Sequence, residues 1–148
     1  MKKMIWLSAL VITLTGAVSA RAAELPKALV DPYLQVQAAL ASDTFEPVAT
    51  NAQAIGAAAA TLGPDAELLA SAAKKLEAAK DIAAARTAFG EVSTALVAYA
   101  EKTKSELGAE LRVAYCPMVN RPWLQKDKEI KNPYYGAAML TCGEFKKK

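Results

Sequence analysis

Apolar residues recur three or four positions apart through most of residues 25–108, and this helical periodicity most constrains the fold. Leu29, Tyr33, Val36 and Leu40 form the first of several such stripes, and alanine fills much of the sequence between them. This spacing places apolar side chains on one face of a helix, and no strand-like alternation persists. Prolines, glycines and caps interrupt the stripes, and no fixed repeat period recurs. We therefore expect helices that pack in a compact up-and-down bundle.

The boundary signals divide this region into segments. Asp31-Pro32 marks a helix start or restart, because proline is tolerated in the first turn. The other expected helices are a stripe from Val48 to Leu62 that ends at Gly63-Pro64, a helix from Asp65 to Ala79, and a long helix that is capped by Asp81 and runs to about Leu107, before Gly108. The sequence thus predicts an all-α fold, an up-and-down bundle of three to four helices with an irregular Pro- and aromatic-rich C-terminal segment.

Three side chains on the long helix carry specific expectations. Phe89 lies in its apolar stripe and is expected to be buried in the bundle. Arg86 and Ser93 are seven residues apart beside the same seam, so they share a face. We expect Arg86 to pair with an acidic residue of a neighbouring helix and Ser93 to form a local hydrogen bond.

The composition changes after Gly108, where prolines and aromatic residues become frequent. Residues 111–116 are expected to be extended, partly because Pro117 disfavours the helical conformation for Cys116. Asn132-Pro133 resembles a helix N-cap followed by proline at the first helical position, and Gly143 would end that short helix or turn.

Four sulfur atoms are concentrated in this C-terminal segment, from about residue 110 onward. They belong to Cys116, Met118, Met139 and Cys142, in a chain that contains no histidine. Cys116 and Met118 would point the same way from an extended segment, and Met139 and Cys142 would share a face of a short helix. Two uses remain open: a soft-metal site built from all four residues, or a disulfide between Cys116 and Cys142.

The N-terminus has the pattern of a secretory signal peptide. Lys2 and Lys3 precede an uncharged apolar run, and small residues follow it, so we expect residues 1–22 to be removed on export to the periplasm. The apolar run is shorter than the roughly 20 residues that span a bilayer, so the processed chain is not expected to be membrane-spanning. Residues 23–148 would form a single helical domain.

Processing also changes the net charge. Of the 18 lysines and arginines, three lie in residues 1–22, which leaves 15 basic residues against 15 acidic ones. A neutral chain lacks the basic surface of a nucleic-acid-binding protein. An enzyme is also not expected, because without histidine there is no Ser-His or Cys-His couple, and no glycine-rich phosphate loop is present.

The C-terminal signature resembles that of a known family. The residues that carry the resemblance are Arg86-x-x-Phe89-x-x-x-Ser93, Tyr115-Cys116-Pro117-Met118, Trp123-Leu124, Asn132-Pro133-Tyr134-Tyr135-Gly136 and Met139-x-x-Cys142-Gly143. They are similar to uncharacterised periplasmic domains that occur alone or fused to the C-terminus of the adaptor subunit of heavy-metal efflux pumps, especially copper and silver exporters. The resemblance covers nearly all of the processed chain.

The resemblance implies that the protein handles copper or silver, with an efflux adaptor or pump as its partner. The Cys-Pro-Met core also resembles short heavy-metal-binding motifs in which histidine follows the methionine, but Val119 and Asn120 stand there in this chain. The remaining all-sulfur set favours Cu(I) or Ag(I) over zinc, for which methionine is not a usual ligand.

A disulfide is the alternative reading of the same cysteines. In an oxidising compartment a lone pair of cysteines usually becomes a disulfide, and closing the loop between them would add about 3 to 4 kcal/mol on the chain-entropy model. Two hypotheses follow: a periplasmic Cu(I)- or Ag(I)-binding protein, and a disulfide-stapled helical interaction module that binds no metal.

Overall fold

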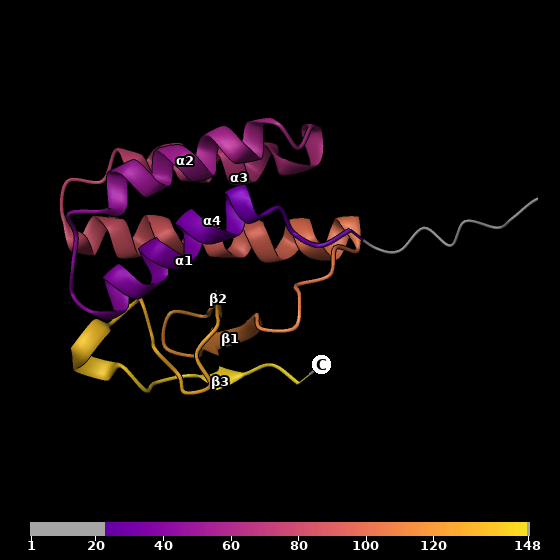
Figure 1. Cartoon of the computed structure of the whole chain (residues 1–148). Helices are drawn as coiled ribbons and strands as arrows, with labels where there is room; N and C mark the ends of the chain where they lie inside the picture. Colours follow the sequence, from indigo (N-terminus) through magenta and orange to yellow (C-terminus); the bar gives the residue numbers. More distant parts are fainter. Residues whose placement is uncertain (1–22, 148) are drawn as a thin grey trace, which may run out of the picture.

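The computed structural model describes residues 23–147 (Figure 1). The expected signal peptide, residues 1–22, lies outside the described residues. Within the described part, the first residues already join the fold, because the backbone N–H of Leu25 donates to the carbonyl of Glu106 and the N–H of Glu106 donates to the carbonyl of Ala23. In this part of the chain, no helix is both long enough and apolar enough to cross a membrane.

The helical region follows the apolar stripes of the sequence closely. Its elements are α1 (Lys27–Ala41), α2 (Val48–Ala60), a 3₁₀ turn η1 (Pro64–Ala66), α3 (Glu67–Glu77) and α4 (Ile82–Thr103). Asp81 caps α4 as expected, because its side chain accepts a hydrogen bond from the backbone N–H of Ala84 at 2.8 Å. The end of α4 comes earlier than predicted, since Lys104 adopts the left-handed conformation that ends a helix, four residues before Gly108.

The prediction of an all-α fold is wrong, because the C-terminal segment forms a sheet. Over residues 23–147 the fold is mixed, with four α-helices and a three-stranded antiparallel sheet. The strands are β1 (Arg112–Cys116), β2 (Arg121–Gln125) and β3 (Glu144–Phe145), in the order β2-β1-β3. β1 lies in the segment that Pro117 indicated to be extended. The two partner strands give little local signal, since β2 contains Pro122 and β3 is only two residues long.

The turn between β1 and β2 fixes their register. Residues 117–120 form the turn, in which Asn120 takes a positive φ of 54°. Ala114 then faces Trp123, and Val113 faces Leu124. The short helix or turn expected after Asn132 is a turn over residues 133–135, which leads into the 3₁₀ helix η2 (Gly136–Met139).

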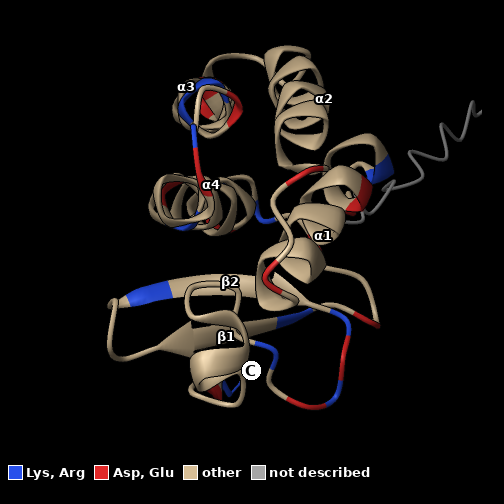
Figure 2. Ribbon diagram, turned by 90° about the vertical axis from the view of Figure 1, so that its left-hand side faces the viewer, with Lys and Arg blue, Asp and Glu red and all other residues tan. Residues whose placement is uncertain are grey.

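The elements lie in three layers (Figure 2). α2 and α3 pack together as the outer layer, α1 and α4 form the middle layer, and the sheet lies on the other side of them. β2 contacts both α4 and α1, and one core cluster of buried residues runs from the helices into the sheet. Phe89 is fully buried at this junction, with its ring centroid 5.0 Å from that of Tyr33 and 6.2 Å from that of Tyr134.

Two polar side chains of α4 hold the layers together, and one of them differs from its expectation. Arg86 forms an ion pair with an acidic residue, as predicted, and its partner Asp43 lies in the turn that follows α1. The expectation for Ser93 is wrong, because its partner is distant in sequence: Ser93 Oγ and Tyr33 Oη are 2.7 Å apart in the core. The packing of α1 against α4 thus satisfies a hydroxyl that local sequence would pair with its own helix.

Candidate functional site

The two cysteines meet at the side chain of Asn132. The amide nitrogen of Asn132 donates to Cys116 Sγ at 3.3 Å and to the carbonyl oxygen of Cys142 at 2.7 Å. Both cysteines are free thiols in this structure. We call these three residues the thiol cluster.

Sheet pairing brings the two cysteine segments together. Tyr115 of β1 pairs with Glu144 of β3, so Cys116 comes beside the chain that leads into β3, where Cys142 lies. Gly143, between Cys142 and β3, has a φ of 141°, and a Cβ atom there would lie 2.7 Å from the ring of Trp123. Only glycine therefore lets the chain pass this close to the sheet.

Asn132 is itself held rigidly. It is fully buried, its Oδ1 accepts from the backbone N–H of Tyr134 at 2.8 Å, and its own N–H donates to the carbonyl of Leu140 at 2.7 Å. Sequence reasoning found the first of these roles, because an Asn side chain that bonds its own backbone two residues later is the expected cap or turn. The contacts of the side-chain amide nitrogen with Cys116 and Cys142 were not predicted, because the local sequence pattern carries no signal for a contact with β1.

The two thiols differ in access. Cys116 is fully buried, whereas Cys142 is partly exposed. Loss of hydration raises the pKa of the Cys142 thiol, and the neighbouring Cys116 raises it further. Cys142 therefore stays protonated at neutral pH and is the thiol that an approaching reagent would meet first.

The two methionines lie beside the cysteines in sequence but are placed differently from them. Met118 is in the turn between β1 and β2 and is 63% exposed. Met139 ends η2 and is partly buried, and its carbonyl accepts from the backbone N–H of Cys142 at 3.0 Å. The structure connects the two cysteines through Asn132, and it presents the thioether of Met118 to solvent.

The remaining ligand chemistry of the described chain is sparse. Within residues 23–147, no group of three or more His, Cys, Asp or Glu side chains is arranged to hold a metal ion.

The η2 segment beside the thiol cluster is anchored to the helices by one carboxylate. Asp43 accepts a hydrogen bond from the backbone N–H of Ala137 at 3.0 Å and pairs with Arg86 at 2.5 Å. Arg86 also donates to the carbonyl oxygens of Leu40 and Pro133, at 3.0 and 3.2 Å. The hydrogen bond from Arg86 lowers the pKa of the Asp43 carboxyl, and the bond from Ala137 adds to this effect.

Comparison of the chain with protein-family models, with curated proteins and with solved structures gave no match.

Proposed function

We propose that the protein binds a soft monovalent metal ion, Cu(I) or Ag(I), in the periplasm, through Cys116 and Cys142 with Met118 and Met139 as further ligands. The observation that carries the proposal is that Asn132 joins the thiol of Cys116 to the backbone carbonyl of Cys142, which brings two free cysteines from distant segments together. Thiolate and thioether sulfur are the ligands that select Cu(I). The resemblance of the C-terminal signature to domains of copper and silver efflux systems supports the same cargo and an adaptor or pump as partner.

The difference between the two thiols supports an order of binding. Cys142 and the exposed Met118 would receive the ion from a donor, because the buried Cys116 is less accessible. The ion would then be held between Cys142 and Cys116. Exposure of Met118 also leaves a thioether available for passing the ion to the next carrier.

The first test is competition for Cu(I) between the reduced protein, lacking residues 1–22, and a chromogenic chelator. We expect one Cu(I) per chain, displacement by Ag(I), and much weaker binding of Zn(II). Cys116→Ser and Cys142→Ser should each abolish binding. Met118→Leu and Met139→Leu should each weaken it with little effect on folding, since Met and Leu have similar volumes. Leu68→Met, which adds a thioether at a position of α3 that is 78% exposed, is the matched control and should leave affinity unchanged.

Binding should also depend on pH. Because the pKa of Cys142 is raised, the metal must displace a proton at neutral pH, so the apparent affinity should increase as the pH rises. The proposal would be wrong if the reduced protein took up no Cu(I), or if both methionine variants bound it as tightly as the parent.

A second candidate function has support from the same pair of cysteines. Asn132 holds the Cys116 thiol and the Cys142 backbone side by side, so the two cysteines become a disulfide under oxidising conditions if their sulfurs move together. The protein would then be a stapled interaction module. Mass spectrometry of protein isolated from the periplasm distinguishes the two. A quantitative Cys116–Cys142 crosslink, together with no Cu(I) uptake after reduction, would favour the module.

A further inference from the structure

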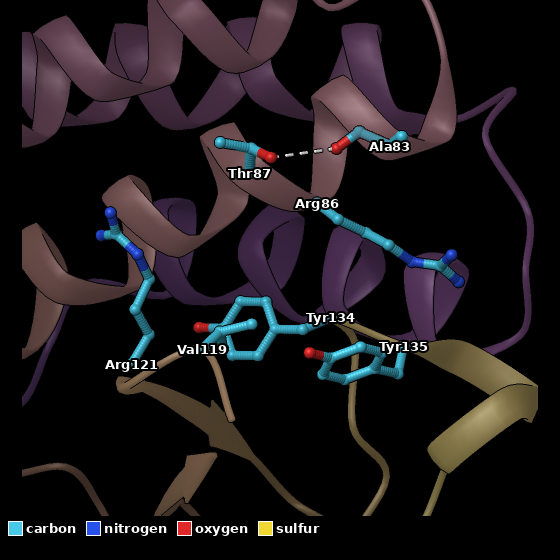
Figure 3. Close-up of a pocket in the computed structure, with 7 residues that line it drawn as sticks. All are labelled: Ala83, Arg86, Thr87, Val119, Arg121, Tyr134 and Tyr135. Atoms are coloured by element: carbon cyan, nitrogen blue, oxygen red, sulfur yellow. Dashed lines mark hydrogen bonds between the residues drawn. The ribbon is translucent and has the colours of Figure 1, made fainter. Parts of the chain in front are cut away.

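A second site, which contains neither cysteine, lies between α4 and the sheet. It is a pocket of about 470 Å³, within the range of small-molecule sites. The residues that line it come from α4, the turn before β2, β2 itself and the turn before η2; they are Ala83, Arg86, Thr87, Val119, Arg121, Tyr134 and Tyr135 (Figure 3).

Two arginines stand at the two ends of this pocket, and only one of them is neutralised. Arg86 points away from the centre, toward Asp43, with which it is paired (Figure 3). Arg121 forms no ion pair with any residue that the structure describes, and its Nη1 donates to Thr94 Oγ1 at 3.3 Å. A guanidinium has five N–H donors, so Arg121 keeps charge and donors for a ligand.

The side chain of Arg121 lies in a space that Gly90 of α4 leaves open. A Cβ atom on Gly90 would lie 2.5 Å from Arg121 Cδ and 3.5 Å from the ring of Tyr134. Glycine inside a helix is destabilising relative to alanine. At position 90 the missing side chain allows Arg121 to pass across the surface of α4. The arginine is thus held against α4 rather than extended into solvent.

The wall opposite α4 is apolar and aromatic. The side chains of Val119 and Tyr134 lie together near Arg121, and the ring of Tyr135 lies beyond them toward Arg86 (Figure 3). The hydroxyl of Tyr134 is occupied, because it donates to the carbonyl of Pro122, so this wall offers chiefly ring surface. A single unpaired cation at one end of an apolar pocket is complementary to a ligand with one negative end.

We propose that this pocket binds a carboxylate with an apolar or aromatic body. The carboxylate pairs with the guanidinium of Arg121, and the body lies against Val119, Tyr134 and Tyr135. This activity goes beyond metal binding and does not need the thiols. The same chemistry occurs in a free organic acid and in a phenylalanine carboxylate at the end of a protein chain, so the test includes both sources.

Isothermal titration of the reduced, metal-free protein with 3-phenylpropionate tests the proposal, with the neutral 3-phenylpropanamide as the matched ligand. We expect saturable one-to-one binding of the acid, and binding of the amide at least about tenfold weaker, as for the loss of a charge-assisted hydrogen bond. Arg121→Gln should weaken binding of the acid by a similar factor. Lys102→Gln removes a cation farther along α4 that pairs with Asp65, and it should have no effect.

A peptide that ends in a phenylalanine carboxylate, compared with its amidated form, identifies the source. Tighter binding of the peptide acid than of 3-phenylpropionate indicates a protein partner, and the reverse order indicates a free acid. The proposal is overturned if neither acid shows saturable binding, if acid and amide bind equally, or if a folded Arg121→Gln variant binds like the parent. Should that variant fail to fold by circular dichroism, the comparison of acid with amide on the parent protein still decides.

Discussion

The backbone N–H of Leu124 donates a hydrogen bond to the hydroxyl of Tyr33 at 3.0 Å, and both residues are fully buried. This bond joins α1 to β2, and the same Tyr33 hydroxyl is also hydrogen-bonded to Ser93 Oγ of α4. Burial raises the pKa of Tyr33, so its hydroxyl stays neutral over the working range of pH. Helices and sheet therefore share one polar contact in the middle of the core.

Replacing Tyr33 by phenylalanine should destabilise the protein by about 1 to 3 kcal/mol, because it leaves the buried N–H of Leu124 without an acceptor. Urea unfolding followed by circular dichroism measures the loss. Ser93→Ala is the matched control, since it removes one partner of the hydroxyl but keeps the bond to Leu124, and it should cost less. A change in Tyr33→Phe no larger than in Ser93→Ala would contradict this role of the bond.

Phe89→Ala should lower the free energy of unfolding by about 3 to 5 kcal/mol, the usual loss for a core aromatic residue. Its ring is fully buried between Tyr33 and Tyr134, so truncation opens a cavity at the junction of the layers. Leu68→Ala on α3 is the comparison, because this side chain is 78% exposed and its loss should fall within about 0.5 kcal/mol. Equal effects of the two substitutions would show that the core does not depend on Phe89.

Stability should fall in acid because of Asp43. Its folded-state pKa lies below the ordinary value of 3.8, so the carboxylate stabilises the fold above that value and loses this contribution as the pH falls through the lower, folded-state pKa. Thermal unfolding between pH 6 and about pH 2 should therefore depend less on pH in Asp43→Asn than in the parent. Asp127→Asn is the control, since Asp127 pairs only with the nearby exposed Lys131. Identical pH profiles for Asp43→Asn and the parent would exclude this contribution.

The helices could be predicted from the sequence because their information is local. The apolar stripe of α4 and the cap at Asp81 each depend on residues within one or two helical turns of one another, and the structure has both. The end of α4 was misplaced because Lys104 adopts a left-handed conformation that is more usual for glycine, which made Gly108 the stronger signal.

The sheet could not be predicted in the same way, because its strands depend on distant partners. Residues 111–116 were predicted to be extended, but the pairing of β1 with β2 and β3 is decided by packing of Trp123 and Leu124 under the helices. The candidate site has the same limit. Clustering in the sequence singled out Cys116 and Cys142, whereas the contact of Asn132 with β1 exists only once the sheet has formed.

Because the helices and the sheet share one core, ligand binding at the thiol cluster should change the thermal stability of the helices. Cys116 belongs to β1, β1 is bonded to β2, and β2 packs on α1 and α4, so the folded helices and the assembled thiol cluster depend on the same contacts. A ligand that binds only the folded cluster raises the stability of the whole chain by mass action, by an amount set by its concentration relative to its dissociation constant. The temperature at which the far-ultraviolet signal of the helices is lost, measured at increasing ligand concentrations, thus reports ligand binding at two sulfur atoms that lie in a strand and a loop.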